Sequence, residues 1–119
     1  MRTFEDQPDR QVVDLQLALK RLGGDEAMLR ELIEIFLRET PDWMTRLEWA
    51  INQGDTDEVF RRAHDIKGST HVFAAAAAVE AAQSLEQMGR IADLDGADEA
   101  FGVLQAELVW VRQALQSFS

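Results

Sequence analysis

Apolar residues recur in alternating steps of four and three along the carboxyl-terminal part of the chain. The members are Ala97, Phe101, Leu104, Leu108, Val111, Leu115 and Phe118. This spacing places all of them on one face of an α-helix, and shorter runs of the same kind occur upstream. No segment of useful length alternates apolar with polar residues as a half-buried strand does. With only two prolines in 119 residues, the sequence predicts an all-α protein.

Capping residues and glycines divide the chain into five expected helices. Their approximate limits are 12–22, 25–53, 55 to a break within 71–74, 75–89 and 96–118. Asp55 and Glu58 have the spacing of a capping box, and Gly89 is expected to close the fourth helix. The break is placed within 71–74 because weak helix formers gather there in a span without proline.

Pro41 falls inside the second expected helix. A proline there either kinks one long helix or opens a new helix that Thr40 caps, and we favour the single kinked helix. The four longer helices, joined mostly by short loops, predict an antiparallel four-helix bundle with the short first helix as a lid. The expected organisation is a flexible amino-terminal tail over residues 1–11 and one bundle domain over residues 12–119.

The charge balance and the missing residue types narrow the possible functions. The chain has 22 acidic and 12 basic residues and a formal net charge of −10, which makes nucleic acid and anionic membranes poor partners. It has no cysteine, which excludes disulfides, thiol nucleophiles and cysteine-ligated metals. No apolar run reaches the roughly 20 residues of a membrane span, and the charged amino terminus does not resemble a signal peptide. We therefore expect a cytoplasmic protein.

The stretch AHDIKGSTHVF contains a histidine, His64, and a glycine, Gly68, in an otherwise helical segment. On a helix, Phe60, Arg61, Lys67 and Gly68 would lie on the same face as His64. Alanine in place of Gly68 would stabilise a helix by about 1 kcal/mol. The glycine therefore suggests that something must approach the imidazole closely.

Basic residues surround this histidine in a protein that is acidic overall. Arg61, Arg62 and Lys67 outnumber the one acidic residue between them, Asp65, and such a basic island suits an approaching anion. An exposed histidine is largely neutral in the cytoplasm and is a nitrogen nucleophile that needs no separate base. A phosphoryl group fits these features, because its transfer requires mainly in-line positioning and charge balance.

The run AHDIKGS, with Leu85-Glu86 downstream, resembles the histidine-containing phosphotransfer (HPt) domain of bacterial multistep phosphorelays. Upstream, LALKRLGGDEAMLRELIEIFLRETPDWMTRLEWAINQGD resembles the amino-terminal half of that domain, including the GGD turn and the GD before the histidine helix. The resemblance spans about residues 15–86, and the final expected helix is compatible with it.

This resemblance implies roles for individual residues. His64 would accept a phosphoryl group from a receiver-domain aspartate and pass it to another, Lys67 would support the phosphoryl oxygens, and Gly68 would leave room for the receiver. The residues expected to contact the partner are Phe60, Arg61, Arg62, Lys67, Gly68 and His71. The partner would be the receiver domain of a response regulator or of a hybrid sensor histidine kinase, and it would supply Mg²⁺. We expect the chain itself to be a monomeric carrier without a metal, a cofactor or independent turnover.

One position departs from the HPt pattern. Ala74 stands where the family usually has a second glycine, ten residues after the histidine, and we expect slightly altered helix packing there with transfer retained. The departure leaves open an alternative function, in which the chain binds a receiver or a kinase without accepting phosphate. A third alternative, an independent enzyme, has no support from paired carboxylates, a nucleophile triad or a phosphate loop.

Both histidines also have a simpler interpretation. His64 could be an ordinary surface histidine, and His71, which lacks the surrounding motif, is expected to be a helix-end residue that borders the docking surface. A metal site formed by the two is not expected, because they lie about 10 Å apart along one helix and no Glu-x-x-His spacing is present.

Overall fold

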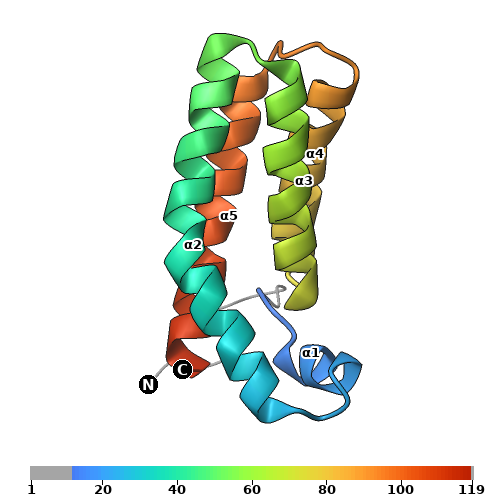
Figure 1. Ribbon diagram of the computed structural model, residues 1–119, viewed down its shortest axis with the longest axis vertical. Helices are drawn as coiled ribbons and strands as arrows, with labels where there is room; N and C mark the ends of the chain where they lie inside the picture. Colours follow the sequence, from blue (N-terminus) through green and yellow to red (C-terminus); the bar gives the residue numbers. More distant parts are fainter. Residues whose placement is uncertain (1–11, 119) are drawn as a thin grey trace.

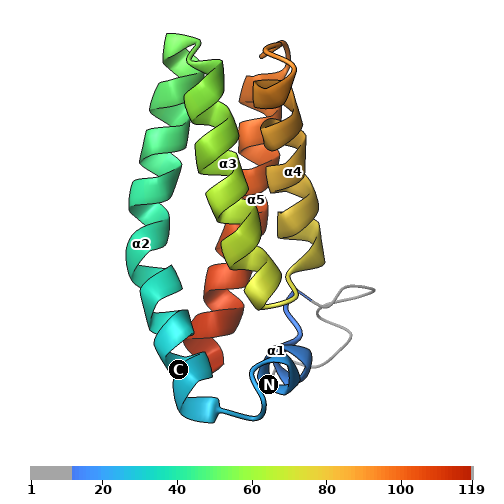
Figure 2. The same ribbon diagram turned by 45° about the vertical axis from the view of Figure 1, so that its right-hand side comes forward.

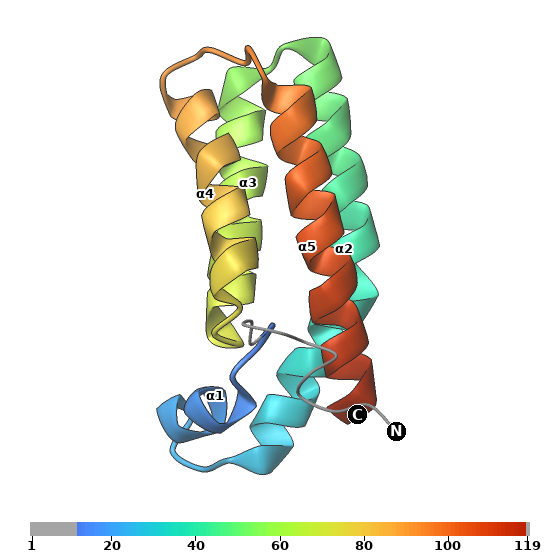
Figure 3. The same ribbon diagram turned by 180° about the vertical axis from the view of Figure 1, so that it is seen from behind.

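The computed structural model describes residues 12–118, and within that range it contains five α-helices and no strand. The helices are α1 (Leu15–Arg21), α2 (Glu26–Gln53), α3 (Thr56–Val72), α4 (Ala76–Arg90) and α5 (Ala97–Phe118). In Figure 1 and Figure 3, α2 to α5 run alternately up and down as a bundle, and α1 lies at its lower end. The expected four-helix bundle with a short first helix is confirmed. The expected tail over residues 1–11 lies outside the described residues.

Aspartate side chains define where the first three helices begin. Each accepts a hydrogen bond from the backbone N–H three residues ahead, in the pairs Asp14–Leu17 (3.0 Å), Asp25–Met28 (3.0 Å) and Asp55–Glu58 (3.1 Å). Such caps satisfy backbone donors that the start of a helix leaves without a partner. The expected caps at Asp25 and Asp55 are confirmed. The first helix begins at Leu15 and not at Val12, because Asp14 caps it.

Helix α2 passes through Pro41 without ending, as expected, and Figure 1 shows that it bends along its length. Proline has no N–H, so the carbonyl oxygen of Leu37, four residues earlier, lacks its helical donor. The Arg112 side chain of α5 donates a hydrogen bond to that oxygen (2.9 Å). A neighbouring helix thus satisfies the group that the proline leaves free, and α2 remains one helix.

The core lies where the apolar faces of α2 to α5 meet. The buried residues of α3 are Val59, Ala63, Ile66 and Thr70, and those of α5 are Ala97, Phe101, Leu104, Leu108, Val111 and Leu115. The α5 set agrees with the spacing seen in the sequence, apart from Phe118, which is only half-buried, and the α3 set follows the same steps of four and three. The periodicity therefore identified the core faces of these two helices correctly.

Small residues bring α4 close to α3. Ala78, Ala82 and Gly89 are buried, and a Cβ atom at Gly89 would lie 2.6 Å from the backbone nitrogen of Phe60. That distance is far shorter than van der Waals contact, so no larger residue fits without a shift of the backbone. The expectation that Gly89 ends the fourth helix is wrong, because α4 continues to Arg90 and needs this glycine for packing.

The connection between α3 and α4 has a left-handed backbone at Ala74, with a φ of +53°. It falls in the predicted break, since α3 ends at Val72. Residues other than glycine disfavour this conformation, which gives a physical reason for the glycine of the HPt pattern. The Asp14 N–H donates to the Phe73 carbonyl oxygen (2.9 Å) and so attaches α1 to this connection, beside which α1 lies in Figure 2.

Candidate functional site

His64 lies near the middle of α3, with its side chain 60% exposed. Its Nδ1 atom is 2.5 Å from Oε2 of Glu86 on α4, and Oε1 of the same carboxylate is 2.6 Å from Nζ of Lys67. The Glu86 side chain is only 4% exposed, whereas that of Lys67 is 27% exposed. One buried carboxylate therefore links the histidine and the lysine that the sequence placed at the centre of the site.

Glu86 reaches α3 because the two helices pack closely. It precedes Gly89 by one helical turn, and the missing side chain of Gly89 lets the α3 backbone approach. A buried carboxylate is unfavourable unless it is paired and hydrogen-bonded. Both oxygens of Glu86 have a partner on α3, so the pairing with His64 and Lys67 compensates for the burial.

The pKa of Glu86 is below its ordinary value of 4.5. Burial is the largest single influence and raises the pKa, but the hydrogen bonds from Lys67 and His64, together with the charge interactions with both residues, outweigh it. Glu86 is therefore ionised at neutral pH, and in that state it can only accept hydrogen bonds.

The ionised Glu86 determines which nitrogen of His64 is available. Because the carboxylate only accepts, the Nδ1 atom beside it carries the hydrogen. In neutral imidazole the free lone pair then belongs to Nε2, the nitrogen that Glu86 does not bind. The imidazole is thus held in one tautomer with a nucleophilic nitrogen available on an exposed side chain.

An aromatic ring and a further cation extend the site along α3. The rings of Phe60 and His64 are stacked, with centroids 5.9 Å apart and planes inclined by 15°. The guanidinium carbon of Arg90, on α4, lies 5.6 Å from the centroid of the Phe60 ring. Arg90 was not among the candidates from the sequence, because only the packing of α4 on α3 brings it beside Phe60.

Gly68 lies on the outer side of α3, where an added Cβ atom would meet no other atom within 4 Å. Packing therefore does not require a glycine there, and the approach of a partner remains the predicted reason for it. Arg61 is exposed on α3, three residues before His64. Arg62 instead lies 3.5 Å from Glu58 and 3.6 Å from Asp65, both on its own helix.

His71 is exposed in the last turn of α3, two turns from His64. Its backbone oxygen accepts a hydrogen bond from Arg21 of α1 (3.2 Å). The structure does not bring its side chain into the hydrogen-bonded cluster of His64, Lys67 and Glu86. Its position is that of the helix-end residue that the sequence indicated.

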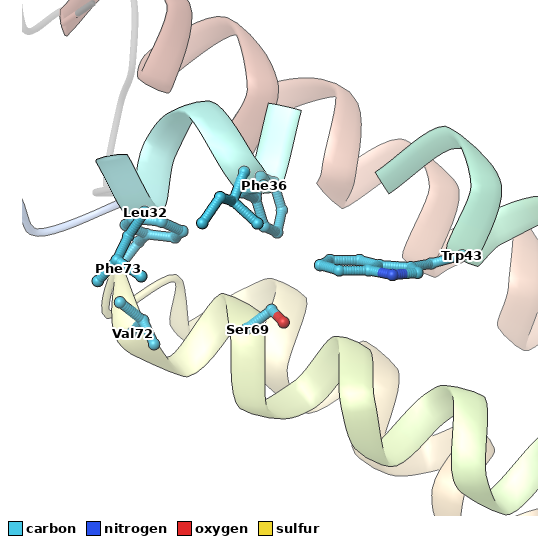
Figure 4. A pocket seen from close by; sticks show the side chains of 7 residues that line it. Leu32, Phe36, Trp43, Ser69, Val72 and Phe73 are labelled. Carbon is cyan, nitrogen blue, oxygen red and sulfur yellow. The ribbon is translucent and has the colours of Figure 1, made fainter. Parts of the chain in front are cut away.

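An open apolar pocket of about 80 Å³ lies between α2 and α3. The residues that line it are Leu32, Ile35, Phe36, Trp43, Ser69, Val72 and Phe73. In Figure 4 the Trp43 ring lies at one end of the pocket, and Val72 and Phe73 lie at the other. Because Val72 follows Gly68 by one helical turn, the pocket adjoins the surface that carries His64.

Two further kinds of feature are absent from the part of the chain that the structure describes. Between residues 12 and 118, no group of three or more His, Cys, Asp or Glu side chains is arranged to hold a metal ion. In the same range, no helix combines the length and the apolarity of a membrane span.

Glu86 is the site residue whose role the sequence did not reveal. The pair Leu85-Glu86 is part of the resemblance to HPt domains, but the resemblance assigned no role to the Glu86 carboxylate. A signal was present, because Glu86 follows Ala82 by four residues and precedes Gly89 by three, so an acid occupies the buried face of its helix. A buried acid needs partners, but the sequence does not show which residues of α3 face it.

No curated protein sequence matches the chain significantly. The crystal structure of histidine-containing phosphotransfer protein B (HptB) from Pseudomonas aeruginosa PAO1 has a similar fold, with a TM-score of 0.83 at 19% identity over 92% of this chain and 95% of that chain. The family model of the Hpt domain matches residues 31–114. Since this match takes in most of the chain and all of α3 and α4, which carry His64, Lys67 and Glu86, the chain belongs to the Hpt domain family.

Proposed function

We propose that this chain is a phosphorelay protein that carries a phosphoryl group on Nε2 of His64. The observation that supports this most is the hydrogen bond between Nδ1 and the buried carboxylate of Glu86, which leaves Nε2 of an exposed side chain as the nucleophile. The donor would be a phosphorylated aspartate of one receiver domain, and the next acceptor an aspartate of another. Membership of the Hpt domain family supports the same function.

The proposed transfer is a displacement at phosphorus. The Nε2 lone pair forms a bond to phosphorus while the bond between phosphorus and the aspartyl oxygen breaks, and the aspartate leaves as a carboxylate. The imidazole ring gains positive charge in this step, because Nδ1 keeps its hydrogen. Ionised Glu86, 2.5 Å from Nδ1, would stabilise that charge. The reverse step would deliver the phosphoryl group to the next aspartate.

Lys67 would support the phosphoryl oxygens beside His64. Its ammonium group has three N–H donors, and one of them is used by Glu86 at 2.6 Å. The other two would be available to the phosphoryl group, because the side chain is partly exposed. The pairing with Glu86 also holds the ammonium group near the imidazole, so less freedom is lost when the phosphoryl group arrives.

The receiver would dock on the surface of α3 that carries His64 and on the adjoining pocket. Because Gly68 has no side chain, no atoms project from the helix surface beside the imidazole at this position. Trp43 and Val72 line the adjoining pocket and would give the receiver an apolar surface to contact. The receiver would supply the reacting aspartate and Mg²⁺. The chain would act as a cytoplasmic, monomeric carrier without independent turnover.

Label transfer from a phosphorylated receiver domain tests this function. Wild-type protein should acquire acid-labile, alkali-stable label, and His64→Gln should acquire none. His71→Gln, which removes the other histidine, should still acquire label. Label on His64→Gln would overturn the proposal. Receivers that bind the wild-type protein but never label it would favour the alternative, an interaction module that does not accept phosphate.

A further inference from the structure

The cations around His64 differ in whether acids of the same chain already neutralise them. Lys67 is paired with Glu86 at 2.6 Å. Arg62 lies 3.5 Å from Glu58 and 3.6 Å from Asp65. The charges of Lys67 and Arg62 are therefore largely balanced before any partner arrives.

Arg61 and Arg90 are not balanced in this way. Within residues 12–118, neither side chain forms an ion pair with an acid, and the Arg90 guanidinium lies over the Phe60 ring. Arg61 is exposed on α3 three residues before His64, and Arg90 is exposed near the end of α4. Arg61 follows Phe60 on α3, and Arg90 contacts the Phe60 ring from α4, so both arginines lie on the side of His64 nearer the start of α3.

We propose that Arg61 and Arg90 together bind acidic side chains of the receiver domain, next to its reacting aspartate. The inference rests on the proposed function. A receiver that holds Mg²⁺ needs carboxylate ligands around that aspartate, so the surface that meets His64 is acidic. The net charge of −10 on this chain would repel such a surface. Within residues 12–118, these two exposed arginines have no acidic partner, so they would provide a local attraction beside His64.

The positions of these arginines suit recognition of the partner. Both side chains are exposed, whereas Lys67 is the cation hydrogen-bonded into the cluster around the imidazole. The contact with Phe60 restricts the Arg90 guanidinium, and its N–H donors stay available to a carboxylate. Exposed charges at the rim of an interface act mainly on the association rate and on its dependence on salt. Arg61 and Arg90 should therefore change how fast the receiver docks and leave the transfer step within the complex unchanged.

Association kinetics with one isolated receiver domain, chosen because it labels the wild-type protein, test the inference. The double variant Arg61→Gln/Arg90→Gln should associate about tenfold more slowly than wild type at low salt, and the two rates should converge at high salt.

Arg30→Gln/Arg38→Gln is the matched control, because it makes the same change in net charge at two arginines that are paired with Glu26 and Glu39. This control should associate at nearly the wild-type rate. Arg61→Lys/Arg90→Lys should retain most of the salt dependence.

The outcomes separate this inference from the proposed function. His64→Gln should associate with the salt dependence of wild type but acquire no label. Label transfer therefore tests the proposed function, and the salt dependence of the association rate tests the role of the arginines. Wild-type association by Arg61→Gln/Arg90→Gln, with label still transferred, would overturn the inference alone. An equal slowing in the Arg30→Gln/Arg38→Gln control would also overturn it, because the effect would then come from net charge. The transfer rate at saturating receiver should be unchanged, and a loss there would place the arginines in the chemistry instead.

Discussion

Gly68 in α3 and Gly89 in α4 occupy neighbouring helices but have opposite surroundings. A Cβ atom added at Gly89 would lie 2.6 Å from the Phe60 nitrogen and 2.8 Å from the Thr56 oxygen. One added at Gly68 would meet nothing within 4 Å. The fold requires glycine at residue 89. Nothing in the described chain requires glycine at residue 68, which is consistent with the proposed approach of a receiver domain at this position.

The two glycines also separate two tasks of α3. Gly89 lets α4 approach, and this approach puts Glu86 within hydrogen-bonding distance of His64 and Lys67. Gly68 has no part in that packing and lies on the open side of the helix. The side of α3 that faces α4 is therefore fixed by packing and orients the imidazole, while the outer side is open, as the proposed docking of a receiver requires.

Gly89→Ala should have the largest effect on the fold. The new methyl group must displace the α3 backbone, and we expect the free energy of unfolding to fall by about 3 kcal/mol. Urea unfolding followed by circular dichroism measures the change. Gly102→Ala is the matched control, because Gly102 is also inside a helix and a Cβ atom there meets nothing within 4 Å. This control should gain about 0.5–1 kcal/mol. A Gly89→Ala protein as stable as the control would contradict the packing argument.

Gly68→Gln should reduce phosphoryl transfer by about 100-fold, because the new side chain would occupy the space through which the aspartyl phosphate reaches Nε2. Unfolding measurements should show a fold at least as stable as wild type. Gly102→Gln changes another exposed helical glycine, on α5, and should transfer at the wild-type rate. Rapid transfer by Gly68→Gln would show that the glycine is not needed for access.

Much of the fold could be predicted because it follows from residues close together in the chain. Caps such as Asp25 and Asp55 act on backbone groups three residues away, and a helical face is set by its own spacing. The prediction that Gly89 ends a helix is wrong because the role of this residue depends on a contact with another helix. A buried glycine and a terminal glycine look alike in the sequence, and only the approach of α3 distinguishes them.

The same distinction explains which parts of the site could be predicted. His64, Lys67 and Gly68 belong to a single helix, so their shared face follows from the sequence. Glu86 and Arg90 come from α4, and their contacts depend on how α4 is aligned against α3. That alignment is set by the close packing of the two helices and by the connection between them, and neither can be obtained from spacing within one helix.

Glu86→Gln should reduce transfer by about tenfold without weakening receiver binding. The amide oxygen can still accept from Nδ1, so the imidazole keeps its orientation. The reacting ring loses its counter-charge, and the amide N–H₂ cannot accept the hydrogen bond that Lys67 donates to Glu86. Label transfer at saturating receiver measures the effect. Glu80→Gln makes the same substitution at an exposed position of α4 and should leave transfer unchanged. If Glu86→Gln transfers as well as wild type, orientation alone explains the role of Glu86.

The charge of Glu86 should also make stability depend on pH. Its folded-state pKa lies below the ordinary value of 4.5, so the stabilisation is complete above about pH 4.5 and is lost as the pH falls through the folded-state pKa. Glu86→Gln lacks this titration. The difference in free energy of unfolding between wild type and Glu86→Gln should therefore shrink on acidification, as urea unfolding at a series of pH values would show. A difference that stays constant would mean that the carboxylate does not titrate in this way.

Ala74 is the converse of Gly89, a methyl group at a position whose backbone suits glycine. Its φ of +53° is unfavourable for alanine by about 1 kcal/mol, so Ala74→Gly should stabilise the fold by roughly 0.5 kcal/mol once the greater freedom of glycine in the unfolded chain is subtracted. Ala92→Gly, at a φ of +58° beyond α4, should give a similar gain. Transfer should not change in either variant, because neither residue takes part in the hydrogen bonds of His64. Faster transfer in Ala74→Gly alone would show that the methyl group of Ala74 changes the packing of α4 on α3. Because Glu86 belongs to α4, such a change would alter its hydrogen bond with the imidazole.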